Sequence, residues 1–269
     1  MHRPTIALTI AGSDPGGGAG LQADLTTFTR LGVHGATAIT AITVQDTRDV
    51  ADFDVLPARR LADQIEITLA DLPVAAIKIG MLGSAENVET VAAILAAHPH
   101  IPVVLDPVMV AGGGSELATR AVVDLTRERL LPRATVVTPN TPEAARLSGH
   151  DDARRWGETL RALGARNVLI TGGDAPADAE ANRQSLPPIV NVLYREDGHM
   201  RRFELPRLPP SFHGSGCTLA AAIAAFLARG RDLEPAIIEA QGFMTEAIAT
   251  GYAPGRGQHV PNRLCPQAG

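Results

Sequence analysis

The most constraining feature of this 269-residue sequence is an alternation of short apolar runs with longer segments of helical periodicity. The apolar runs expected to form strands are residues 5–11, 36–44, 75–78, 103–106, 135–138 and 168–171. The segments expected to form helices are residues 20–31, 58–70, 85–97, 118–131, 141–147, 151–163, 217–229 and 233–249. Such alternation is typical of β-α-β units, in which a helix joins two parallel strands. It predicts one α/β domain over residues 1–269, with a central, mostly parallel sheet and helices on both faces.

The pattern changes after Gly173, where the periodicity no longer alternates. Residues 190–194 and 201–205 flank the dipeptide Asp197-Gly198, which favours a tight hairpin turn. We therefore expect a small antiparallel β addition to the sheet. Residues 174–188 are polar and contain proline, and we expect them to form a surface loop.

Composition and charge exclude several classes of partner. The formal net charge is −5 and only nine residues are Phe, Trp or Tyr, whereas single-stranded nucleic acids are bound by basic grooves with aromatic platforms. Two cysteines in a chain of this length indicate a reducing compartment. The longest apolar stretch, residues 219–228, is about half of a membrane span, and the N-terminal apolar run does not resemble a signal peptide. We expect a cytoplasmic protein with neither a nucleic-acid nor a membrane partner.

Polar or glycine-rich segments follow each predicted strand. In open parallel sheets, ligands bind at the carboxyl ends of the strands. The segments that end the predicted strands are residues 11–20, 45–47, 80–81, 106–107, 138–140 and 171–173. Together they predict a small-molecule site along this edge of the sheet.

The first glycine-rich loop, Gly16 to Gly20, leads into a predicted helix that contains Asp24. The loop lacks the Gly-Lys-Ser/Thr ending of a Walker A motif and the spacing of a dinucleotide-binding motif. Its glycines allow the backbone to approach a small ligand closely, although an ordinary turn between a strand and a helix has the same composition. Asp24 could hold a polar group of a ligand, or it could only stabilise the start of its helix.

The second glycine-rich segment, residues 213–218, lies directly before an apolar helix. The free N–H groups of the helix start, which include those of Gly214, Ser215 and Gly216, predict an anion-binding site. We expect the positive end of the helix to lower the pKa of the Cys217 thiol below its free value of roughly 8.5, which would make it a base or a nucleophile. The alternative is a small buried cysteine without chemical function.

Asp106, Asn140 and Glu143 supply oxygen atoms of the type that Mg²⁺ prefers. Asp106-Pro107 could also be a simple turn. Residues 141–143 combine Pro and Glu in the manner of a helix start. A role in binding Mg²⁺ and a role in the local turn or helix start do not exclude each other.

The assembled motifs resemble the hydroxymethylpyrimidine/phosphomethylpyrimidine kinases of thiamine biosynthesis, which belong to the ribokinase-like superfamily. The segments that carry this resemblance occur in one order over nearly the whole chain: residues 11–24, 43–47, 78–82, 104–110, 138–143 and 213–218. The resemblance implies a three-layer αβα fold, a homodimer, and ATP and Mg²⁺ as cofactors. It implies transfer of the ATP γ-phosphoryl group to 4-amino-5-hydroxymethyl-2-methylpyrimidine, and then to its monophosphate.

The resemblance also implies a role for particular positions of this sequence. Cys217 would accept the alcohol proton, and Gly214, Ser215 and Gly216 would hold the transferred phosphate. The pyrimidine pocket would be lined by Gly12, Asp24, Gln45, Met81 and Val108. The nucleotide would contact Asn140, Thr171, Gly172 and Gly173, and the metal would be organised by Asp106 and Glu143.

Two departures from the family pattern remove positive charge. The family often has Lys-Gly-Gly-His where this chain has Thr171-Gly172-Gly173-Asp174, and Ala-Lys-Ser-Gly where it has Ala111-Gly112-Gly113-Gly114. Lysines near phosphates contribute point charges to their binding. We therefore expect the first phosphorylation to be better supported than the second. Two alternatives remain: a pyridoxal or pyridoxine kinase of the same superfamily, and a pyrimidine-binding sensor that has lost transfer activity.

Overall fold

The computed structural model describes residues 4–173, 187–208 and 212–264, and most of the predicted loop at 174–188 lies outside them. The described strands form one nine-stranded sheet in the order β3-β2-β1-β4-β5-β6-β7-β8-β9. Six neighbouring strands are parallel, which confirms the predicted α/β architecture. They are β2 (His34–Gln45), β1 (Ile6–Ser13), β4 (Val74–Ile79), β5 (Val103–Leu105), β6 (Val136–Val137) and β7 (Val168–Ile170).

Antiparallel strands extend the sheet at both edges. The predicted hairpin is present as β8 (Ile189–Tyr194) and β9 (Met200–Leu205), and β8 pairs with β7. At the opposite edge, β3 (Val50–Val55) pairs with β2 and was not predicted. Its two aspartates, Asp52 and Asp54, interrupt the apolar pattern because this edge strand is largely exposed to water.

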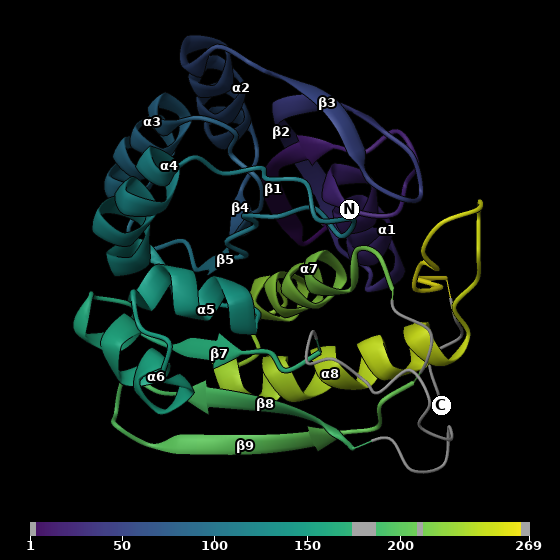
Figure 1. Ribbon diagram of the computed structural model, residues 1–269. Coiled ribbons are helices and arrows are strands. Elements are labelled where there is room, and N and C mark those ends of the chain that lie inside the picture. The colour runs from purple at the N-terminus through teal and green to yellow at the C-terminus, as the bar shows by residue number, and fades with distance from the viewer. Residues whose placement is uncertain (1–3, 174–186, 209–211, 265–269) are drawn as a thin grey trace.

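Helices cover both faces of the sheet, as expected (Figure 1). One face carries α1 (Gly20–Arg30), α7 (Ser215–Ala228) and α8 (Leu233–Ala249), and the other carries α2 (Ala58–Asp71), α3 (Ala85–Ala97), α4 (Arg120–Leu125), α5 (Thr141–Ser148) and α6 (Ala153–Ala162). Neighbouring strand residues contribute to opposite cores, as the period of a strand requires. Ala7 and Val104 pack in the core under α7, whereas Leu8 and Leu105 pack in the core under α2 to α6.

Helix α7 is the central element of its layer. Every residue from Thr218 to Phe226 is buried, and the helix contacts β1, β4 and β5. Its alanines allow close approach to the sheet. This packing places the N-terminus of α7 over the carboxyl ends of the parallel strands.

The helix predicted over residues 118–131 is shorter than expected. Helix α4 ends at Leu125 and is followed by a π-helical turn, Thr126–Leu130, and a 3₁₀ turn, Leu131–Arg133. Pro132 lacks an N–H group and disfavours a regular α-helix here. Within the described ranges, no helix has both the length and the hydropathy required to span a membrane.

Candidate active site

A cavity of about 760 Å³ lies at the carboxyl ends of the parallel strands, beside the N-terminus of α7. This is the edge at which the sequence predicts a ligand site. The predicted residues that line the cavity are Gly12, Gln45, Met81, Asp106, Val108, Asn140, Glu143, Thr171, Gly173, Gly214, Ser215, Gly216 and Cys217. Asp24 and Gly172 do not line it. Asp24 is wholly buried behind the wall, and the backbone of Gly172 packs against the carbonyl of Val190.

The two glycine-rich loops touch each other at the start of α7. Gly214 precedes the helix in the left-handed conformation (φ 74°), and a Cβ at this position would lie 1.9 Å from the carbonyl oxygen of Gly18. Thr218 donates the first backbone hydrogen bond of the helix, to Gly214. The N–H groups of Ser215, Gly216 and Cys217 therefore precede the helical hydrogen-bond ladder, as the prediction of an anion-binding site requires.

Cys217 is partly exposed in the cavity wall. Burial raises the pKa of the Cys217 thiol to about 12, because it outweighs the attraction to the Lys78 ammonium, and the Asp106 and Asp24 carboxylates act in the same direction as burial. The sequence-based expectation of a lowered pKa is therefore wrong, since the cost of desolvating the thiolate exceeds its attraction to Lys78. At neutral pH the thiol carries its proton.

A buried ionic cluster lies behind Cys217. Lys78 Nζ is 3.1 Å from Asp24 Oδ2 and 3.4 Å from Asp106 Oδ2, and Thr9 Oγ1 donates a hydrogen bond of 2.6 Å to Asp24. Burial alone would lower the pKa of Lys78, but Asp24, Cys217 and Asp106 raise this pKa above its usual range. The ammonium is thus held in the charged form under the site. A lysine inside an otherwise apolar strand is the sequence signal that could have identified this role.

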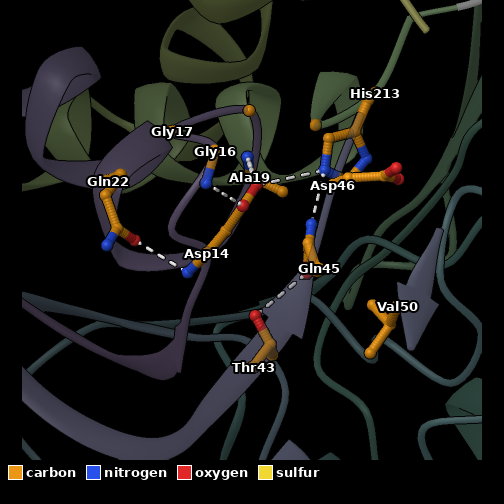
Figure 2. Close-up of polar contacts among 12 residues, drawn as sticks. Asp14, Gly16, Gly17, Ala19, Gln22, Thr43, Gln45, Asp46, Val50 and His213 are labelled. Atoms are coloured by element: carbon orange, nitrogen blue, oxygen red, sulfur yellow. Dashed lines mark hydrogen bonds and ion pairs between the residues drawn. The ribbon is translucent and has the colours of Figure 1, made fainter. Parts of the chain in front are cut away.

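At one end of the cavity, Asp14 organises the first glycine-rich loop (Figure 2). Its Oδ1 accepts a hydrogen bond from the N–H of Gly16 (2.7 Å), and its Oδ2 accepts one from the N–H of Ala19 (2.8 Å). Oδ2 also lies 3.2 Å from Nε2 of His213. The same nitrogen of His213 lies 3.0 Å from the side-chain amide of Gln45. Neither Asp14 nor His213 was assigned a role from the sequence.

Apolar side chains complete this end of the cavity. Met81 is buried, and its sulfur lies 3.4 Å from where a Cβ on Gly12 would be. Val108 and Leu117 also line the cavity here. Among the described residues of the lining, Phe212 is the only Phe, Trp or Tyr. Aliphatic and thioether groups therefore predominate in this part of the lining.

Comparison with known proteins identifies the family. The family model for phosphomethylpyrimidine kinase matches residues 14–262. The chain belongs to the phosphomethylpyrimidine kinase family. This confirms the resemblance seen in the sequence motifs.

Relatives in this family are similar over almost the whole chain. The hydroxymethylpyrimidine/phosphomethylpyrimidine kinase of Haemophilus influenzae is 43% identical over 97% of this chain and 97% of its own length. The thiamine biosynthesis bifunctional protein ThiED of Geobacter sulfurreducens is 43% identical over 96% of this chain. The match spans only 52% of that protein, so this chain corresponds to about half of it.

Solved structures of two kinds of kinase share the fold. An ADP complex of Bacillus subtilis pyridoxal kinase superposes with a TM-score of 0.87 at 34% identity, covering 98% of both chains. The phosphomethylpyrimidine kinase of Clostridium difficile superposes with a TM-score of 0.75 at 35% identity, covering 90% of this chain and 99% of its own. These neighbours confirm the predicted ribokinase-like fold.

At its opposite end, the cavity is bordered by β8, β9 and α8. The apolar lining of this end consists of Ile189, Leu205, Leu208, Met244 and Ile248. Arg207 also lines it and donates hydrogen bonds to the carbonyl oxygens of Gly173 (3.1 Å) and Gly172 (3.3 Å). A guanidinium therefore lies beside the segment in which this chain has Thr171 where the family often has lysine. Sequence reasoning did not identify Arg207.

The carboxylates that a phosphomethylpyrimidine kinase could use for Mg²⁺ differ in their other contacts. Glu143 and Asn140 form a capping box at the start of α5, and Glu143 Oε1 also accepts a hydrogen bond of 3.4 Å from the N–H of Met109. Asp106 lines the cavity, and its buried Oδ2 lies 3.4 Å from Lys78 Nζ. Those residues contain no cluster of three His, Cys, Asp or Glu suited to a metal ion. In proteins, Mg²⁺ usually takes one or two carboxylates and otherwise uses water and phosphate.

Proposed function

We propose that this chain transfers the γ-phosphoryl group of ATP to the hydroxymethyl group of 4-amino-5-hydroxymethyl-2-methylpyrimidine, and then phosphorylates the monophosphate to the diphosphate. The observation that carries the proposal is the 43% identity to a kinase named for both substrates, over 97% of each chain. The cavity supports it. The polar amide of Gln45 lies at one end, the anion-binding start of α7 lies beside it, and an apolar end suited to a nucleobase lies opposite.

In this proposal, the chain acts chiefly by positioning and by charge stabilisation, as phosphoryl transfer requires. Gln45 holds the polar edge of the pyrimidine, and Met81 and Val108 contact its faces. The N–H groups of Ser215, Gly216 and Cys217 bind the transferred phosphoryl group. The alcohol oxygen forms a bond to the γ-phosphorus, the bond from that phosphorus to the bridging oxygen of ADP breaks, and the alcohol proton passes to the thiolate form of Cys217.

The cofactor assignment follows from the same groups. Asp106 would hold Mg²⁺ together with the nucleotide phosphates, and Glu143 would contribute from the cap of α5. The metal would neutralise charge on the phosphates during transfer. Asn140, Thr171 and Gly173 would contact the nucleotide, and Arg207 would add a positive charge near its phosphates.

Two further properties belong to this proposal. We place the enzyme in the cytoplasm, in keeping with its substrates and cysteine content. We also propose a homodimer, supported by the exposure of Ile42 (55%) and Val44 (62%) on β2. Analytical ultracentrifugation at micromolar concentration tests this, and a single species of 28.2 kDa would exclude the dimer.

The second candidate function is a pyridoxal kinase, because the TM-score of 0.87 to such an enzyme exceeds that to the phosphomethylpyrimidine kinase structure. A coupled ADP-release assay with each alcohol separates the two. We expect a higher kcat/KM for the pyrimidine, and a higher value for pyridoxal would overturn the proposal. Calorimetric binding of the pyrimidine without any ATP turnover would instead establish a sensor.

A further inference from the structure

Two polar side chains, those of Asp14 and Gln45, meet at one nitrogen of His213. Nε2 lies 3.2 Å from Asp14 Oδ2 and 3.0 Å from the amide nitrogen of Gln45, Nε2 (Figure 2). The amide oxygen of Gln45, Oε1, lies 3.2 Å from Thr43 Oγ1. Thr43 Oγ1 also lies 2.8 Å from the carbonyl oxygen of Ser13. A carboxylate or carbonyl oxygen can only accept a hydrogen bond, an N–H group can only donate one, and a hydroxyl has a single hydrogen to donate. The role of one atom in this chain of contacts therefore determines the role of the next.

The carboxylate of Asp14 determines the role of His213 Nε2. Burial raises the pKa of Asp14, but hydrogen bonds to the carboxylate, among them those from the N–H groups of Ala19 and Gly16, lower it below its usual value. Asp14 is therefore ionised at neutral pH and can only accept hydrogen bonds. A bare Nε2 would place a lone pair against this carboxylate. Nε2 must carry a hydrogen, whether the ring is neutral or charged.

The role of Nε2 in turn determines the orientation of the Gln45 amide. An Nε2 that carries a hydrogen and directs it toward Asp14 has no lone pair to accept from the amide N–H group that lies against it. Exchanging the two ends of the amide relieves this contact, because its oxygen then faces His213 and its nitrogen faces Thr43. The hydroxyl of Thr43 then donates its hydrogen to Ser13 O and accepts from the amide, so each of its contacts pairs a donor with an acceptor. The oxygen and nitrogen of a terminal amide exchange places by a rotation about χ3, with no movement of their neighbours.

We propose that His213, held by Asp14, is a specificity-determining positioning residue that fixes the amide of Gln45 with its oxygen toward His213 and its nitrogen toward Thr43. The packing supports this role. A Cβ on Gly18 would lie 2.5 Å from His213 Cδ2, and one on Gly112 would lie 3.0 Å from His213 Nδ1. Glycine on both sides thus leaves the space that the imidazole ring occupies.

The fixed amide selects a class of ring, and this step rests on the proposed function. After its contacts with His213 and Thr43, the Gln45 amide retains one acceptor position and one N–H. These match an amino group next to a ring nitrogen, as in a 4-aminopyrimidine. Reversing the amide of Gln45 would exchange the positions of its acceptor oxygen and its donor N–H. A pyrimidine that bonds to both would then have to turn over, and its hydroxymethyl group would point away from Cys217. Pyridoxal has no amino group beside its ring nitrogen and would not depend on this order.

Nuclear magnetic resonance tests the hydrogen position without any activity measurement. In protein labelled with ¹⁵N-histidine, long-range ¹H–¹⁵N spectra distinguish a protonated from a bare Nε2. The His213 signals are identified by their absence from the spectrum of His213→Gln. We expect a protonated Nε2 at pH 7 to 8. A bare Nε2 with the hydrogen on Nδ1 would overturn the inference, whatever the substrate proves to be.

Kinetics then test the selectivity. His213→Phe fills the space between the glycines but removes the donor, and we expect the ratio of kcat/KM for the aminopyrimidine to that for pyridoxal to fall about tenfold. His213→Gln keeps a donor and should recover part of the ratio. His259→Phe is the matched control, since its ring packs edge-on against Phe212 rather than against Gln45. An equal loss of kcat/KM with both alcohols in His213→Phe would contradict a role in specificity.

Discussion

Lys78 Nζ lies 3.1 Å from Asp24 Oδ2, and both side chains are completely removed from solvent. The substitution Lys78→Met removes the ammonium group and leaves the buried carboxylates of Asp24 and Asp106 without their shared cation. We expect a loss of about 3–5 kcal/mol in the free energy of unfolding, measured by urea denaturation. The double variant Lys78→Met/Asp24→Asn should regain part of this loss, because it removes one of the stranded charges.

Two outcomes would count against the cluster as a stabilising feature. One is an unchanged unfolding midpoint in Lys78→Met. The other is strict additivity of the two substitutions, because residues in direct contact are expected to couple. The exposed pair between Arg154 and Asp152 provides a surface control, and Arg154→Met should leave stability unchanged within error.

The raised pKa of Cys217 predicts a specific pH dependence. If the thiolate of Cys217 accepts the alcohol proton, the rate follows the fraction of the protein in the thiolate form. At pH values below the pKa of about 12, this fraction rises tenfold for each unit by which the pH increases. We expect log kcat to rise with a slope near one between about pH 7.5 and 9.5, and Cys217→Ser to abolish this rise. Stopped-time assays with ATP and the pyrimidine would measure both profiles. A flat wild-type profile would remove Cys217 from the role of proton acceptor.

The space around His213 gives a third prediction. A Cβ on Gly18 would lie 2.5 Å from the ring of His213 and 3.2 Å from Val260 Cγ1, so Gly18→Ala must displace His213. We expect KM for the alcohol substrate to rise about tenfold, with a smaller change in KM for ATP. Gly242→Ala is the control, because nothing lies within 4 Å of its Cβ. In that helix, alanine should add about 0.5–1 kcal/mol of stability and leave both KM values unchanged. A normal substrate KM in Gly18→Ala would show that His213 does not need its present position.

The sequence predicted the layers of this fold because strand and helix periods depend on neighbouring residues. Helices α3 and α8 have the predicted bounds, and the parallel strands differ from prediction by a few residues. Strand β3 was missed since its exposed edge carries aspartates that break the apolar pattern. The sequence pattern therefore predicts helices and strands correctly where buried residues recur with the helix or strand period.

The site was predicted less completely, since its main contacts join distant parts of the chain. Gln45, Met81 and Cys217 lie in sequence motifs that can be recognised locally, and all three line the same cavity. The contact between Asp14 and His213 spans 199 positions in the sequence, and no periodicity reports such a pair. The altered pKa of Cys217 was also beyond local reasoning, because it depends on burial and on charges from three other elements.

The C-terminal segment gives the last prediction, because Arg263 joins the two glycine-rich loops. Its guanidinium is buried and donates hydrogen bonds to Thr218 Oγ1 (2.8 Å) and to the carbonyl oxygens of Gly17 (3.3 Å) and Gly18. Arg263→Leu would leave these acceptors buried without their donor. We expect kcat/KM to fall at least about tenfold for both the alcohol and ATP, because the phosphate-binding N–H groups and the substrate loop lose their common support.

The variant Arg263→Lys distinguishes the effect of the guanidinium's hydrogen bonds from the effect of its positive charge. Lysine keeps the positive charge but cannot reach three acceptors with a planar fork, so activity should recover only in part. Arg256→Leu, an exposed change in the same segment, should retain wild-type kcat/KM. Full recovery by lysine would mean that the charge of Arg263, rather than its contacts with both loops, supports the site. Wild-type kinetics in Arg263→Leu would show that the loops hold their arrangement without it.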